Sequence, residues 1–255
     1  LLYLQSISHQ SFACLPFTET LKTDSFLKIG TPPHSLSIGE TKNYLIFIEE
    51  NKPSPIISVL DCESYKNKLN IPTPGVLDYA IDESKNILYV ANSNNISVYN
   101  LNDANPKKSI QSIHIISPSA LSINPSGNRL YVASKNTNSV TIFDIANKKP
   151  IEKPIDNFTS VKGINLPEDI EFNPFDNKIY VINSGSNTVS VIDEKNNSSH
   201  PIHTCNPKYC RNDGPHRLSI NTHLNENKIY ISNYPNHTIS VISVINGNNY
   251  AVKNI

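Results

Sequence analysis

The amino-acid sequence predicts an all-β fold, a β-propeller of four-stranded antiparallel blades that forms a single domain over residues 1–255. A segment of two strands and one turn recurs at intervals of about 40–50 residues, which is typical of propeller blades. Apolar and polar residues alternate at period two along the chain, and no sustained helical period interrupts them. The 38% hydrophobic composition is sufficient for the core of one large domain.

The recurring segment is clearest in four copies. They read KNILYVANSNNISVYNL, NRLYVASKNTNSVTIFDI, NKIYVINSGSNTVSVIDE and NKIYISNYPNHTISVISV. Each copy has a tyrosine in the same place, at Tyr89, Tyr131, Tyr180 and Tyr230. Two weaker copies come earlier, with Tyr3 and Ile46 in that place. We therefore expect six blades, the first of them incomplete.

A short alternating run precedes each pair of strands and predicts the innermost strand of the blade. These runs are SLSI at 35–38, DYAI at 78–81, ALSI at 120–123, DIEF at 169–172 and RLSI at 217–220. One side of each run is large and apolar, and the other is mostly small, as expected of a strand crowded around a central channel. Runs further downstream supply a fourth strand. The expected blades span approximately 1–30, 31–73, 74–116, 117–164, 165–213 and 214–255.

The predicted strands begin with a second strand at Tyr3 and end with a fourth strand at Ile255, so the first blade lacks its innermost strand. Because natural sheets avoid exposed edges, we expect sequence outside this chain to complete the ring. That sequence would add one strand to give six blades, or one strand and a further blade to give seven in the full-length protein.

These motifs resemble the YVTN family of propellers. The repeat of that family reads approximately Asn-Lys-hydrophobic-Tyr-Val-Ala-Asn, followed by Asn-Thr-Val-Ser-Val-Ile-Asp. The similarity covers nearly the whole chain and is strong in the four later repeats, whereas Ile46 replaces the tyrosine in an earlier one. The resemblance implies the fold more firmly than the function, since related propellers include surface-layer scaffolds, lyases and cofactor-bearing dehydrogenase subunits.

The charge and residue composition narrow the classes of partner. Lys and Arg together number 22, as do Asp and Glu, so no basic excess is available for nucleic acid, and we expect no nucleic-acid partner. No run of apolar residues is long enough to predict a membrane-spanning helix. The sequence contains 35 asparagines, mostly between apolar runs, which is typical of a protein rich in tight turns.

The innermost strands also predict where a ligand would bind. In a propeller, the fourth-to-first connections and the second-to-third turns share one face, and the residues that open each inner strand surround the mouth of the channel. The candidate ligand residues at this mouth are His34, Asp78, Glu168, Asp169, His216 and Arg217. Imidazole and carboxylate groups bind divalent metals, so His34, Glu168 and His216 are candidate metal ligands. The plainer interpretation is that these polar side chains are simply solvated.

The connection before the last repeat is longer than its counterparts and contains two cysteines. Cys205 and Cys210 flank a short step with a proline, which favours a small loop closed by a disulfide. His200, His203 and His216 are close to them in sequence and leave zinc or copper binding as an alternative. A disulfide would place the protein in an oxidising compartment, so we expect an extracellular, cell-surface or periplasmic location.

The sequence favours a non-catalytic scaffold that binds a protein or glycan partner through its loop face. It contains no Gly-rich phosphate loop, no nucleophile elbow and no zinc-protease helix, and we predict no catalytic residue and no resident cofactor. The alternative is a metal-binding, redox-associated or lyase-like propeller that uses the channel mouth. In that alternative a divalent metal would be held there.

Overall fold

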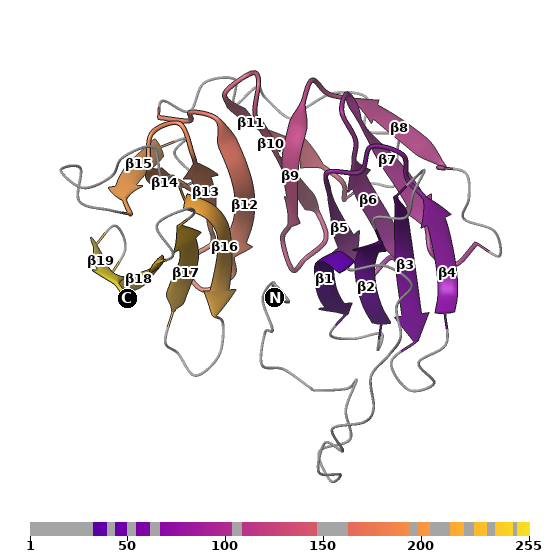
Figure 1. Ribbon diagram of the computed structural model, residues 1–255, viewed down its shortest axis with the longest axis horizontal. Helices are drawn as coiled ribbons and strands as arrows, with labels where there is room; N and C mark the ends of the chain where they lie inside the picture. The colour runs from indigo at the N-terminus through magenta and orange to yellow at the C-terminus, as the bar shows by residue number, and fades with distance from the viewer. Residues whose placement is uncertain are drawn as a thin grey trace, which may run out of the picture.

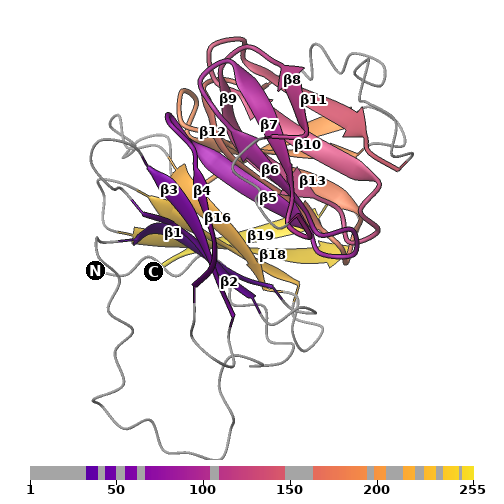
Figure 2. The same ribbon diagram turned by 90° about the vertical axis from the view of Figure 1, so that its right-hand side faces the viewer.

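The computed structural model describes residues 33–39, 44–49, 55–61, 67–103, 109–146, 163–193, 198–204, 215–221, 227–233, 238–246 and 249–255. Nineteen strands lie in this part of the chain, and they form five antiparallel sheets. Figures 1 and 2 show the sheets standing next to one another in an arc, with one edge of each toward a shared centre. The predicted all-β propeller is therefore confirmed. The first predicted blade, residues 1–30, lies outside the described residues, so the count of six blades stays a prediction.

Within each sheet, strands that follow one another in the chain are also neighbours in space. The first two blades are β1 (Pro33–Gly39), β2 (Tyr44–Glu49), β3 (Ile56–Asp61) and β4 (Asn67–Pro72), then β5 (Asp78–Asp82), β6 (Ile87–Ala91), β7 (Asn95–Asn100) and β8 (Gln111–His114). The third has the described strands β9 (Pro118–Ile123), β10 (Arg129–Ser134) and β11 (Ser139–Asp144). The last two are β12 (Pro167–Asn173), β13 (Lys178–Asn183), β14 (Thr188–Asp193) and β15 (Ser198–His203), then β16 (Pro215–Asn221), β17 (Lys228–Asn233), β18 (Thr238–Asn246) and β19 (Asn249–Asn254).

The hydrophobic core is divided among the interfaces between neighbouring blades. In β6, Leu88 and Val90 pack with residues of the β1–β4 blade, whereas Tyr89 and Ala91 pack with residues of the β9–β11 blade. Similar clusters lie between the third and fourth described blades and between the fourth and fifth. Both sheet faces are therefore buried, each against a different neighbour, which is why a second strand such as β6 is a nearly continuous apolar run.

The tyrosine that marks each repeat packs against the next blade along the chain. Tyr131 stacks on Phe172, with ring centroids 5.6 Å apart and planes 3° from parallel. Tyr180 meets Tyr250 edge to face, at 6.5 Å. Both repeat tyrosines are fully buried, but the equivalent Tyr230 is 37% exposed. No further blade covers Tyr230 within the described residues, because it belongs to the last sheet of the arc.

Asparagine has two distinct roles in the repeat. Among the residues that the structure describes, six non-glycine residues have positive φ, and four of them are asparagines in tight turns, at Asn86, Asn138, Asn177 and Asn187. Three others close the second strand of a blade and donate from Nδ2 to a serine Oγ in the third strand. These pairs are Asn92 with Ser97 at 3.0 Å, Asn183 with Ser190 at 2.9 Å, and Asn233 with Ser240 at 2.8 Å. The turn-rich composition thus follows from the geometry of the repeated hairpin.

Gly127 offers a test of how closely two blades approach each other. Its φ is 60°, and a Cβ there would lie 2.7 Å from Oδ2 of Asp82, a buried carboxylate paired with Lys85. We expect Gly127→Ala to destabilise the fold by about 2–4 kcal/mol, because it adds a clash with this buried group to the cost of a left-handed alanine. Chemical denaturation measures the change.

Gly75→Ala is the matched control for this prediction. Gly75 has a φ of 75°, but a Cβ there would meet only Ser93 Oγ, at an ordinary contact distance of 3.7 Å. The control carries the backbone cost alone, about 1 kcal/mol. Equal losses in the two variants would show that the contact between Gly127 and Asp82 is unimportant.

Candidate functional site

The innermost strands are joined across blades by side chains that face the channel. Asp78 Oδ2 accepts a hydrogen bond from the Leu121 N–H, at 2.8 Å, on the next inner strand. Asp169 Oδ2 accepts from the Leu218 N–H in the equivalent way, at 2.9 Å. Ser122 and Glu171 make the same kind of bond from the position two residues further along the aligned inner strand. They accept from the N–H groups of Phe172 and Ile220 respectively. Polar residues of the channel therefore hold adjacent blades in register.

A β-bulge at the start of most inner strands positions the side chains of the channel mouth. In four blades a register shift follows the proline that opens the strand, and one extra residue lies in the bulge. These extra residues are His34, Ser119, Glu168 and His216. A bulge changes the direction of the side chain it carries. Consecutive residues such as Glu168 and Asp169 can therefore both contribute to one site.

The carboxyl groups of the channel have raised pKa values. Burial raises the pKa of Asp78 to about 7, and the nearby charge of Asp169 adds to this, while the Leu121 N–H and Arg217 oppose the rise. Burial likewise raises the pKa of Asp169 to about 6, against the lowering effect of the Arg217 charge. The pKa of Glu171 lies well above its ordinary value for the same reason, burial. Near neutral pH this part of the channel carries less negative charge than its composition indicates.

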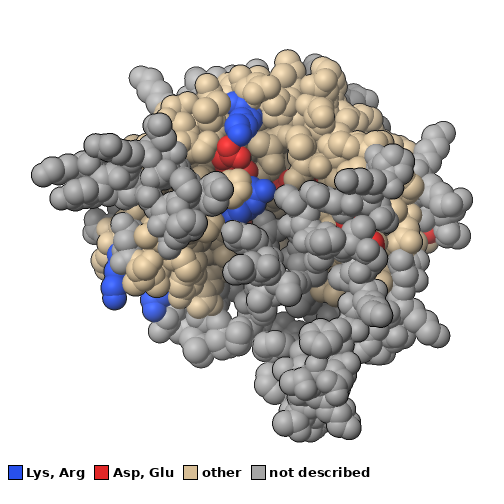
Figure 3. Space-filling view, in the orientation of Figure 1, with Lys and Arg blue, Asp and Glu red and all other residues tan. Residues whose placement is uncertain are grey.

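A pocket of about 400 Å³ opens at the channel mouth. Loops and strand ends from all five described blades contribute to it. Its walls are formed by Ile48, Pro55, Val76, Leu77, Ser117, Pro118, Ser119, Lys135, Glu168 and Arg217. The volume is within the usual range for a small-ligand site. Figure 3 shows basic and acidic side chains close together near the centre of one face, over the start of β12, surrounded by a largely uncharged described surface.

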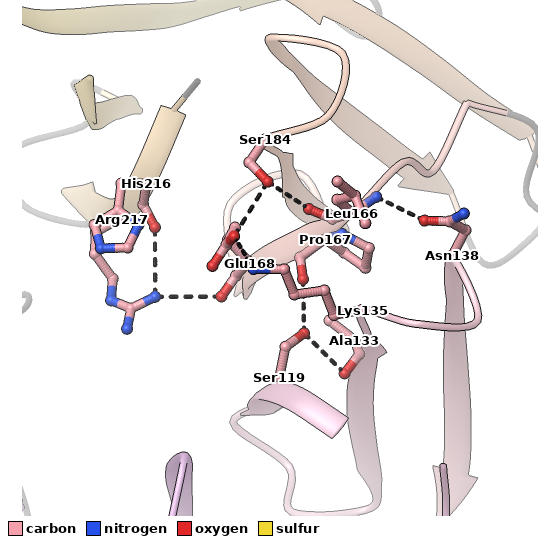
Figure 4. Close-up of polar contacts among 10 residues, drawn as sticks. All are labelled: Ser119, Ala133, Lys135, Asn138, Leu166, Pro167, Glu168, Ser184, His216 and Arg217. Atoms are coloured by element: carbon pink, nitrogen blue, oxygen red, sulfur yellow. Dashed lines mark hydrogen bonds and ion pairs between the residues drawn. The ribbon is translucent and has the colours of Figure 1, made fainter. Parts of the chain in front are cut away.

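Glu168 is the acidic group of this pocket, and its neighbours hold it in place. Lys135, in the turn between β10 and β11, forms an ion pair with Glu168, and Ser184 Oγ donates to the same carboxylate at 3.2 Å (Figure 4). Burial alone would raise the pKa of Glu168. The hydrogen bond and charge of Lys135 outweigh this effect, with Ser184 and the charge of His216, so the pKa is lowered. Glu168 therefore remains ionised and engaged at neutral pH.

Arg217 is the second basic group that lines the pocket. Its guanidinium Nη1 donates to the backbone carbonyls of Glu168, at 3.2 Å, and of His216, at 3.4 Å (Figure 4). The ion pairs of Lys85 with Asp82 and of Lys135 with Glu168 do not include Arg217. The remaining N–H groups of Arg217 can therefore serve a ligand.

The structure brings several of the predicted site residues together at the mouth. Glu168 and Arg217 line the pocket, and Asp78 and Asp169 bridge the inner strands near Arg217. His216 is exposed, and its charge acts on Glu168. No group of three His, Cys, Asp or Glu side chains near enough to share a metal occurs in the described residues. The side chain of His34 lies outside them, so the metal set of His34, Glu168 and His216 stays a prediction.

Cys205 and Cys210 also lie outside the described residues, so the disulfide stays a prediction. Lys135 was not among the site residues predicted from the sequence. The signal that could have found it is its position in the turn between the second and third strands of its blade, because that turn shares a face with the start of the next inner strand, where Glu168 lies.

Within the described ranges, the structure contains no helix with the length and apolar character of a membrane span.

A model of the family described as "Lactonase, 7-bladed beta-propeller" matches residues 77–150 and 108–207, which together make up about half of the chain. The chain belongs to this family. The resemblance to YVTN repeats thus predicted the propeller correctly, but the matching family is that of the lactonase propellers. Five blades of this lactonase-family propeller lie in the described residues. No curated protein matches the sequence.

Solved structures show the same fold at low sequence identity. A protein from Lactobacillus plantarum has a TM-score of 0.70 and 14% identity, over 88% of this chain and 70% of that one. Kuenenia stuttgartiensis hydrazine synthase gives 0.65 and 17%, over 90% and 68%. A chain of a mitotic checkpoint complex gives 0.66 and 13%, over 90% and 68%. At these identities the similarity concerns the fold of this lactonase-family propeller alone.

The raised pKa of Asp78 predicts how stability depends on pH. The folded protein binds the proton of the Asp78 carboxyl more tightly than the unfolded chain does. The protonated carboxyl therefore contributes fully to the free energy of unfolding below pH 3.8, and this contribution is lost as the pH rises through about 7. We expect Asp78→Asn, which keeps an acceptor for the Leu121 N–H, to reduce the loss of unfolding free energy between pH 5 and pH 8 by about 1–3 kcal/mol. Denaturant titrations at several pH values measure this difference.

The control for this prediction is Asp103→Asn, which alters an exposed carboxylate away from the channel. This variant should follow the wild-type curve. If Asp78→Asn also follows the wild-type curve, burial of the Asp78 carboxyl does not govern the pH dependence.

Proposed function

We propose that this propeller is a non-catalytic binding protein that recognises a protein or glycan partner through its loop face, centred on the pocket at the channel mouth. The observation that carries the proposal is that the acidic groups described around the pocket are already engaged by the fold. Glu168 is held by Lys135 and Ser184, and Asp78 and Asp169 accept backbone N–H bonds from the next blade. These contacts favour a fixed surface for recognition over groups that exchange protons with a substrate.

The arrangement of the blades supports a binding role. Five blades contribute to a single pocket, so each of its walls is set on a rigid sheet. Ser119 joins two of them, since its Oγ donates to the carbonyl of Pro167 at 2.7 Å, with the carbonyl of Ala133 in its own blade as the alternative acceptor at 3.2 Å. A site that is largely formed before the ligand arrives loses little conformational entropy on binding.

The lactonase family match supports a second candidate, hydrolysis of a lactone. The pKa values of Asp78 and Asp169, about 7 and about 6, are suitable for proton transfer near neutral pH. We rank this candidate second because both carboxyl groups hold neighbouring blades together. The sequence resemblance to YVTN repeats also favours binding, because surface-layer scaffolds belong to that group of propellers.

The binding proposal is tested by selecting ligands from a random peptide library and from an array of glycans. Leu77 is 45% exposed on a wall of the pocket, and Phe175 is 41% exposed in the turn between β12 and β13, at the other end of the inner strands. We expect Leu77→Ser to weaken the selected ligands by roughly fivefold, about 1 kcal/mol, and the matched Phe175→Ser to leave them unchanged. Titration calorimetry measures the affinities.

Hydrolysis of glucono-δ-lactone, followed by proton release, is measured on the same protein. We expect the rate to equal that of the uncatalysed reaction. Catalysis that disappears in Asp169→Asn, together with a failure to select any ligand that depends on Leu77, would replace the binding proposal with the lactonase candidate.

We also propose an extracellular, cell-surface or periplasmic location, on the strength of the sequence around Cys205 and Cys210. In denatured, unreduced protein we expect these two thiols to be unreactive toward iodoacetamide, and to react after reduction. Mass spectrometry of the labelled peptides measures this. Two labelled thiols before reduction would contradict both the disulfide and the argument for location.

A further inference from the structure

One backbone position in the loop before the inner strand has a left-handed conformation in three consecutive blades. It is occupied by Gly75, Ser117 and Leu166, with φ values of 75°, 51° and 48°. Each lies six residues before the last apolar residue of its inner-strand motif, so the three are equivalent. Glycine adopts this conformation freely, whereas a residue with a Cβ is strained, and a bulky one is rare there. Leucine at 166 is therefore unfavourable for the backbone.

Hydrogen bonds at both ends keep Leu166 in this conformation. Its N–H donates to Asn138 Oδ1 at 2.7 Å, and its carbonyl accepts from the N–H of Ser184 at 3.2 Å. The Ser184 hydroxyl can donate either to this carbonyl, at 2.9 Å, or to Glu168 (Figure 4). The side chain contributes little to the core, because the residue is 40% exposed. The fold thus holds a large apolar side chain toward solvent at a position where glycine would cost less. Strained residues that the surroundings hold so firmly are commonly found at binding sites.

Two more exposed apolar residues lie in the neighbouring loops of the same face. Leu77 precedes β5 and is 45% exposed, and Ile116 precedes β9 and is 56% exposed. Leu77 is part of the pocket wall, together with Val76 and Pro118. Leu166 lies next to the wall, because Ser184 donates from its N–H to the carbonyl of Leu166 and from its Oγ to the carboxylate of Glu168. Leu77 therefore lies in the pocket wall, and Ile116 and Leu166 lie in the loops beside it.

Arg217 supplies the positive charge of the pocket wall that lies outside an ion pair. Lys135 and Glu168 neutralise each other in their ion pair, which leaves the guanidinium of Arg217. The raised pKa of Asp78, about 7, reduces its negative charge near Arg217 at neutral pH, whereas Asp169, with a pKa of about 6, remains largely ionised there. Arginine with free N–H groups binds carboxylates in a planar, bidentate geometry. The complementary ligand therefore carries a carboxylate beside apolar groups.

We propose that the pocket at the channel mouth docks an acidic peptide segment of a partner protein, with a Glu or Asp carboxylate on Arg217 and a flanking aliphatic side chain against Leu77 and Leu166. The proposal rests on the binding function proposed above and specifies the ligand of that site. The exposed leucines favour an aliphatic peptide side chain over a sugar ring, which is edged with hydroxyl groups. Burial of the leucines contributes to the binding free energy only when apolar surface on both partners is removed from water.

The test uses two peptides, acetyl-Ala-Leu-Glu-Leu-Ala-amide and the same peptide with Gln in place of Glu, titrated into the full chain and followed by amide chemical shifts. We expect the Glu peptide to bind at least tenfold more tightly than the Gln peptide. Arg217→Gln should remove this preference. Leu166→Gly should weaken both peptides by about fivefold, and its thermal unfolding midpoint should be unchanged or higher, since the backbone strain is relieved.

Ser117→Gly is the matched control, because it relieves the same left-handed strain in the neighbouring blade without removing an apolar side chain. It should bind both peptides like the wild type. Equal affinity for the Glu and Gln peptides, or full affinity in Leu166→Gly, would overturn the inference. Sodium glucuronate is titrated in parallel. Tighter binding of glucuronate than of the Glu peptide, lost in Arg217→Gln, would assign the site to acidic glycans, which overturns the peptide docking but keeps the binding function.

Ligands selected from the libraries that depend on Leu77 but not on Arg217 or Leu166 would also refute this inference while the binding function stands. If no ligand is selected and neither peptide binds, both the inference and the binding function fail.

Discussion

Burial of each sheet face against a neighbouring blade is the constraint on which the rest of the structure depends. A single four-stranded sheet with two apolar faces is not stable in water, so it needs a partner on each side. Leu88 and Val90 of β6 face one neighbour, and Tyr89 and Ala91 face the other. Because every blade satisfies the same requirement, the inner strands are brought side by side, and their polar side chains come to line a common channel.

The channel combines a structural role with a location suitable for binding. Asp78 and Asp169 satisfy backbone N–H groups of the next inner strand, which would otherwise face a narrow, poorly solvated space. The bulge at the start of β12 then places Glu168 above Asp169 at the mouth. The same local geometry that joins two blades therefore also directs charged groups toward the pocket, and Arg217 is the basic group left for a ligand.

Much of the fold could be predicted from the sequence because the repeat is local. The alternation within each copy, the tyrosine at 89, 131 and 180, and the asparagine-rich turns depend on contacts within one blade or between consecutive blades. The face that carries the site follows from strand order alone. The ring positions His34, Ser119, Glu168 and His216 could be aligned from sequence, but the bulges that hold them were not foreseen, since a bulge has no period.

The remaining features of the site depend on the distance between blades, which the sequence does not record. The ion pair of Lys135 with Glu168 joins residues from two blades, and so does the effect of Asp169 on Asp78. The left-handed backbone of Leu166 could not be recognised either, because leucine gives no sign of such a conformation. Its equivalence to Gly75 becomes visible only when the two loops are compared in space.

The exposed Tyr230 has a mechanical consequence for the arc of blades. Every other repeat tyrosine in the described sheets is covered by the sheet that follows it, and so removal of a sheet uncovers the tyrosine before it. Loosening of the β16–β19 sheet would expose Tyr180, and the β12–β15 sheet would then lack a neighbour on that face. The blades would thus unfold one after another from this end, and a surface packed against Tyr230 would stabilise all of them.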